Sequence, residues 1–109
     1  MSATATVPVI VTPEAADHVR QLGLEREFAQ ILDYVQRTAP ELLRIEAVLD
    51  YDPDAPVPDA VLIRTVQPEP DRTDLTWKHA FNRWIIATYP PAIGVHFVLM
   101  PGYEARHGR

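Results

Sequence analysis

The sequence predicts an α+β fold in which helices cover one face of an antiparallel sheet of three or four strands. Three observations lead to this prediction. Residues 74–100 combine a helical pattern, a Pro90-Pro91 stop and an apolar run. Residues 13–38 show further helical periodicity, and residues 43–67 hold two strand-like segments around a proline-rich connection. The resulting strand-helix-strand-strand-helix-strand order allows a ferredoxin-like βαββαβ arrangement.

Composition indicates one domain and limits the classes of function. A chain of 109 residues with 47% hydrophobic residues can bury a single core. The formal charge of −5 argues against broad contact with nucleic acid or acidic membranes. No segment approaches the roughly 20 apolar residues of a membrane span, and there is no cysteine for disulfides or thiolate metal sites. We therefore expect a soluble, cytoplasmic, single-domain protein over residues 1–109, with residues 1–6 and 102–109 mobile.

The first half of the chain predicts a short strand followed by two helices. Residues 7–11 are strand-like, although Pro8 lacks an amide donor and fits an edge better than a sheet interior. Thr12 followed by Pro13 is a helix start. The apolar positions change face near Gly23, so we expect helices over residues 13–21 and 25–38 joined by a left-handed glycine. The exposed face of the second helix is mainly acidic, which disfavours a DNA-binding helix-turn-helix.

Two strands with a loop between them follow. Residues 43–50 and 60–67 are expected to pair as an antiparallel hairpin. In the loop, Asp50, Asp52 and Asp54 have the one-three-five spacing of an EF-hand calcium loop. Ala55 stands where that loop needs glycine, and Val61 where it needs a bidentate glutamate. We therefore predict a solvated acidic loop with no metal, and we predict no cofactor for the chain.

The central helix and the strand after it are expected to form the core. Trp77, Phe81 and Trp84 share one arc of this helix and are predicted to be buried. Apolar residues alternate onto both faces of residues 93–100, which predicts an interior strand.

A second stripe on the same helix predicts a partner-binding surface. It recurs at spacings of four, three, four and three residues, and its members are Leu75, His79, Asn82, Ile86 and Tyr89. Apolar residues on a side that should face solvent indicate contact with another chain. The alternative is that a terminal segment of the same chain covers the stripe, or that the helix is packed on both sides.

The histidines supply the only catalytic candidates. His96 lies within an apolar strand, where a functional or a hydrogen-bonded structural role would both fit. His79 and Arg83 are one helical turn apart and could bind an anion. His18 and His107 are expected at the surface.

We therefore expect a small protein-interaction or assembly module without catalytic activity, working as a homodimer or as the accessory partner of another protein. The alternative is a small cofactor-free enzyme of the dimeric ferredoxin-like kind, using His96 with His79 and Arg83. No motif indicates a family, a nucleic-acid partner or a membrane partner.

Overall fold

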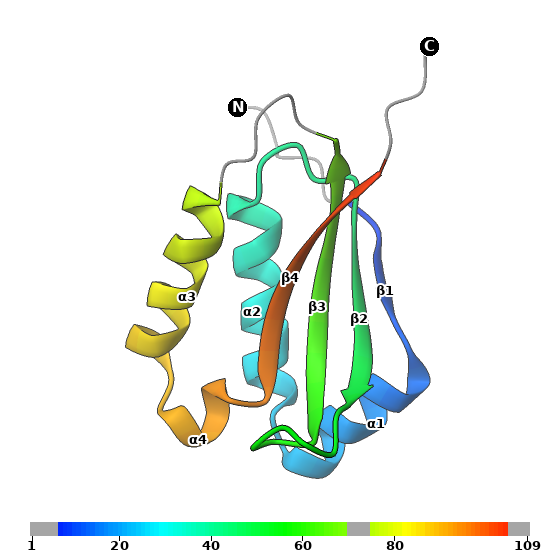
Figure 1. Cartoon of the computed structure of the whole chain (residues 1–109), viewed down its shortest axis with the longest axis vertical. Helices are drawn as coiled ribbons and strands as arrows, with labels where there is room; N and C mark the ends of the chain where they lie inside the picture. Colours follow the sequence, from blue (N-terminus) through cyan, green and yellow to red (C-terminus); the bar gives the residue numbers. More distant parts are fainter. Residues whose placement is uncertain (1–6, 70–74, 105–109) are drawn as a thin grey trace.

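The computed structural model describes residues 7–69 and 75–104. Within them the chain forms four strands and four helices (Figure 1). In chain order these are β1 (Val9–Val11), α1 (Pro13–Leu22), α2 (Glu25–Thr38), β2 (Arg44–Tyr51), β3 (Asp59–Pro68), α3 (Thr76–Thr88), α4 (Pro91–Gly94) and β4 (Phe97–Glu104). The α+β class is therefore confirmed.

Local signals place the ends of the first two helices as predicted. The Thr12 hydroxyl accepts a hydrogen bond from the Ala15 amide at 3.2 Å and caps α1. Gly23 has a φ of 70° and ends the helix in the left-handed conformation. A new helix then begins at Glu25, so the change of apolar face at Gly23 is a true break between two helices.

The strand order differs from the ferredoxin-like one. The sheet runs β1-β2-β3-β4, with β1 parallel to β2, β2 antiparallel to β3, and β3 parallel to β4. Only the predicted β2–β3 hairpin is antiparallel, so the sheet is mixed, and neither the antiparallel sheet nor the ferredoxin-like arrangement is confirmed. A ferredoxin-like sheet would place β1 in the interior. Here β1 is an edge strand of three residues, and Pro8 just before it contributes only its carbonyl, which accepts from the Ile45 amide at 3.0 Å; a proline without an amide donor is tolerated at such a position.

The prediction of an interior last strand was wrong. β4 is the other edge of the sheet, and Val98 and Met100 are 45% and 48% exposed on the face away from the helices. β4 also extends to Glu104, so residues 102–104 pair with β3 instead of belonging to a mobile tail. The other residues of the two predicted mobile ends, 1–6 and 105–109, lie outside the described part of the chain.

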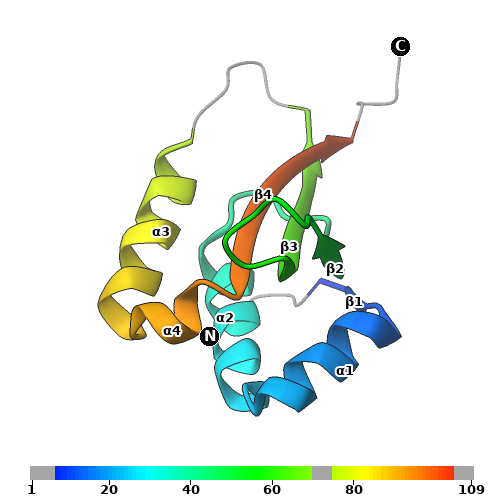
Figure 2. The ribbon, with the colours of Figure 1, turned by 60° about the horizontal axis from the view of Figure 1, so that its bottom comes forward.

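Both helical connections cover the same face of the sheet, as Figure 2 shows. Phe28 of α2 stacks on Phe97 of β4 with ring centroids 5.9 Å apart, and Phe81 of α3 is 1% exposed in the same core. Because the parallel pairs β1–β2 and β3–β4 run in opposite directions, connections on one face must have opposite hands. One crossover is therefore left-handed, which is the uncommon hand.

Of the three residues predicted to form the core arc of α3, Phe81 is confirmed as buried. Trp77 and Trp84 are half-buried and pack against the edge of the core. The helices leave the second face of the sheet uncovered within the described residues, with Ile10, Val98 and Met100 exposed on it. This uncovered side is called the open face below.

Candidate functional site

The predicted stripe on α3 is largely exposed. Ile86 is 77% exposed and Leu75 is 37% exposed, and His79 and Asn82 also face outward. Ile86 lies in the last turn of α3, and at this exposure it forgoes most of the burial energy of an isoleucine side chain, about 1.5–3 kcal/mol. Four of the five stripe residues are thus available to another molecule.

Tyr89, the fifth stripe residue, is engaged within the chain. Its hydroxyl donates to the Gln30 side-chain oxygen at 2.6 Å, and its ring meets Trp84 edge-on with centroids 5.7 Å apart. Burial, followed by the negative charge of Glu27, raises the pKa of Tyr89 above its ordinary value. Tyr89 therefore holds the end of α3 against α2 and borders the stripe.

An apolar pocket adjoins Ile86. The Pro90-Pro91 pair ends α3 and turns the chain into the short α4, and the bend leaves a cavity of about 260 Å³. The lining residues are Ile85, Ile86, Tyr89, Pro91, Gly94 and Val95. Ile86 and this cavity together offer a protruding apolar side chain beside a hollow of the size that an anchor side chain of a partner can enter.

His96 is half-buried next to a second histidine. Its ring lies edge-on to His18 of α1, with centroids 6.5 Å apart. His96 Nδ1 and His18 Nε2 are both buried and have no hydrogen-bond partner among the described residues. His18 was expected at the surface; it is half-buried, with Nε2 turned inward. The two histidines are 78 positions apart in the sequence, so only the tertiary fold brings their rings together. His107 lies outside the described residues.

His79 and Arg83 contribute little to a site at His96. Both side chains are exposed on α3, and neither forms an ion pair within residues 7–69 and 75–104. The ring contact of His96 is made with α1. The predicted combination of a histidine base with an α3 anion site is therefore not assembled by any contact we observe.

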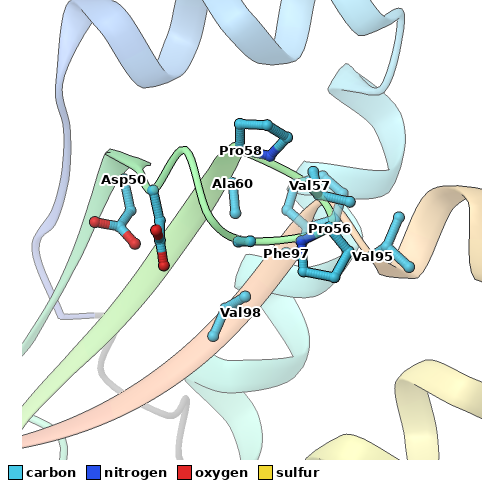
Figure 3. Close-up of a pocket in the computed structure, with 10 residues that line it drawn as sticks. Asp50, Pro56, Val57, Pro58, Ala60, Val95, Phe97 and Val98 are labelled. Atoms are coloured by element: carbon cyan, nitrogen blue, oxygen red, sulfur yellow. The ribbon is translucent and has the colours of Figure 1, made fainter.

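A larger cavity, of about 370 Å³, lies at the hairpin end of the sheet (Figure 3). Pro56, Val57 and Val95 form a cluster at one side of it, and Asp50 stands apart from them in Figure 3. The acidic loop closes on itself here: an Asp52 carboxylate oxygen accepts from the Asp54 amide at 3.1 Å. In the described part of the chain, no group of three or more potential ligands is arranged to hold a metal ion.

Comparisons with family models, with curated proteins and with solved structures gave no match. Within the described ranges, none of the helices is both long and apolar enough to cross a bilayer.

Proposed function

We propose that this protein is a small non-catalytic interaction module, the accessory partner of another protein, which it binds through α3. The binding surface consists of Leu75, His79, Asn82 and Ile86 with Tyr89 at its border. The observation that carries the proposal is the 77% exposure of Ile86 beside an apolar cavity. Apolar surface of this kind, with polar neighbours around it, is characteristic of a docking site.

The cavity indicates how a partner would dock. Its lining is almost wholly apolar, and Tyr89 and Pro91 are rigid walls because Tyr89 is tied to Gln30 and proline is conformationally fixed. A pre-formed hollow binds an apolar anchor without first paying for its own ordering. We therefore expect the partner to insert one aliphatic or aromatic side chain here while His79 and Asn82 form the polar rim.

The experiment compares Ile86→Glu with Ala87→Glu. Both positions are exposed on α3, and consecutive helical residues differ in direction by about 100°, so only the first substitution enters the stripe. We expect tagged wild type and Ala87→Glu to retain the same stoichiometric partner on purification from the native host, and folded Ile86→Glu to lose it. Retention of the partner by folded Ile86→Glu would contradict the proposal.

The same variants address self-association through α3. Light scattering on each pure protein reports its oligomeric state, and a dimer lost only in Ile86→Glu would identify the partner as a second copy of the chain. Unfolding of Ile86→Glu would contradict the proposal that Ile86 belongs to a free surface, since a side chain that is 77% exposed contributes little to the core.

A second candidate function is a small cofactor-free enzyme using His96. It is favoured by the two buried ring nitrogens of His96 and His18 that lack partners among the described residues, because strained or unsatisfied polar groups gather at functional sites. Two observations weaken this candidate. The strand order differs from that of dimeric ferredoxin-like enzymes. The cavities at α4 and at the hairpin are lined by neighbours of His96 and not by His96 itself. If His96 has a catalytic role, it is retained at a cost in stability, and His96→Leu should raise the midpoint of thermal unfolding. A lower midpoint would show that His96 has a structural role.

A further inference from the structure

The open face of the sheet has an ordered pattern across its four strands. Strand register places Ile10, Glu46, Arg64 and Met100 side by side in one row. The row is therefore apolar, acidic, basic and apolar from β1 to β4. The next row toward the hairpin is apolar on β2, β3 and β4, with Val48, Leu62 and Val98.

The two charges at the centre of this row are not equivalent within one molecule. Glu46 binds Arg44, whose Nε lies 2.9 Å from the Glu46 carboxylate, and Arg44 also binds Glu104 at 3.0 Å. Arg64 is exposed and forms no ion pair among the described residues, although Glu46 is directly opposite it on β2. Each molecule thus carries an unpaired guanidinium beside a carboxylate that has room for a second donor.

We propose that a second copy of this chain packs on the open face, related by a two-fold axis that lies above this face, parallel to the strands and over the gap between β2 and β3. This axis places β2 of one copy over β3 of the other. Glu46 then faces Arg64 of the second copy at both symmetry-related positions, Ile10 faces Met100, and Val48 faces Leu62. The row is thus complementary to itself in charge and in hydrophobicity, as an isologous interface requires.

Other ways of joining two copies fit the pattern less well. A two-fold axis above the open face but parallel to the row, across the strands, would place Glu46 against Glu46 and Arg64 against Arg64. Pairing through the free edge of β4 is interrupted by Pro101. The carbonyls of His96 and Glu104 accept hydrogen bonds from the amides of Val61 and Glu69. The even-numbered residues of β4 therefore direct their backbone groups toward β3, and the odd-numbered residues direct theirs toward the free edge. Pro101 is one of the odd-numbered residues and offers no amide donor there.

The size of the face sets the expected strength. Three strands about 4.8 Å apart and about seven residues long, with the three residues of β1 beside them, give a footprint on the order of 400 Å² per copy. Two such footprints, about 800 Å² in total, fall below the roughly 1,000 Å² of a stable specific interface and in the range of a weak one. The axis also brings both acidic hairpin loops to the same end, where their exposed carboxylates are screened by salt beyond about 8 Å. We therefore expect a monomer–dimer equilibrium that depends on protein concentration.

This inference uses the side of the molecule away from α3, so it stands or falls separately from the proposed function. The test is sedimentation velocity over a concentration series on wild type, Glu46→Arg, Arg64→Glu and an equimolar mixture of these two variants. Each single reversal places like charges together at two positions and should weaken the homodimer by at least about 100-fold. The mixture should form a 1:1 heterodimer, because the two reversed charges then face each other at one position and the unchanged Glu46 and Arg64 face each other at the second.

Two controls make the result decisive. Arg26→Glu reverses a charge on α2, away from the open face, and should dimerise as wild type does. If a reversal variant unfolds, as judged by circular dichroism, the neutral pair Glu46→Gln and Arg64→Gln replaces it and should also weaken the dimer. A wild type that stays monomeric at all concentrations, a dimer indifferent to both reversals, a mixture that does not associate, or a dimer lost in Ile86→Glu would each overturn the proposal.

Discussion

The rings of Tyr34 and Trp84 stack face to face, with centroids 4.1 Å apart and planes inclined by 11°. This stack joins α2 to α3, and the guanidinium of Arg37 lies 5.9 Å from the centre of the same Tyr34 ring. Trp84 is half-buried, so its contribution to stability comes from this specific contact as well as from removal of apolar area from water.

We expect Trp84→Ala to lower the free energy of unfolding by about 2–3 kcal/mol, less than the largest values for fully buried aromatic residues because part of the indole already faces water. The double-mutant cycle with Tyr34→Ala should show a coupling energy of about 1 kcal/mol. Urea denaturation of the four proteins measures both quantities. Strictly additive losses would show that the stack contributes no energy beyond burial.

Gly23 and Gly94 should respond to alanine with opposite signs. Gly23 has a φ of 70°, so a Cβ is strained there even though nothing lies within 4 Å of its position, and Gly23→Ala should destabilise by about 1 kcal/mol. At Gly94 the added Cβ would meet only the Ile85 side chain at an ordinary 3.6 Å. Gly94→Ala should be neutral or stabilising by up to about 1 kcal/mol. Thermal unfolding of both variants measures these changes. Destabilisation by both substitutions, or stabilisation by both, would contradict the prediction.

Features with a local cause could be predicted from the sequence. The break at Gly23, the cap at Thr12 and the hairpin of β2 and β3 each depend on signals within a few residues. The strand order could not be predicted in this way, because the same order of elements is compatible with several arrangements of the sheet. Apolar residues on both faces of β4 favour an interior strand, yet on an edge strand they leave Val98 and Met100 exposed.

The candidate sites show the same division. The stripe on α3 could be found because helical periodicity alone defines it. The contact between His18 and His96, and the cavity at α4, depend on packing between distant segments. The side chain of Gln36 gives another example: it accepts from the Val7 amide and donates to the Val7 carbonyl, both at 3.1 Å, and so fixes the entry to β1. No pattern in the sequence signals that pairing.

A buried polar connection between β3 and the end of α2 should be important for stability. The hydroxyl of Thr65, which is fully buried, donates to the Gln67 side-chain oxygen at 3.1 Å, and the Gln67 amide donates to the Pro40 carbonyl at 2.8 Å. Thr65→Val keeps the shape and removes one bond, so we expect a loss of about 1 kcal/mol. Gln67→Leu leaves the Pro40 carbonyl without this donor and should cost more, about 2–3 kcal/mol. Equal losses in denaturant titrations of the two variants would contradict this ranking.

The last prediction concerns alkaline pH and Tyr89. Burial and the nearby Glu27 raise the pKa of Tyr89 in the folded protein, whereas in the unfolded chain it stays near its ordinary value of about 10. The folded state therefore holds the phenol proton more tightly. The stability linked to that proton is fully present below about pH 10 and is lost as the pH rises through the higher folded-state pKa. Tyr89→Phe removes this dependence together with the hydrogen bond to Gln30. The unfolding free energy of wild type minus that of Tyr89→Phe should thus be constant from pH 7 to about pH 9 and fall above about pH 10. All other titrating groups are common to both proteins and cancel in this difference, so a difference that stays constant across the alkaline range would show that Tyr89 is no more buried than in the unfolded chain.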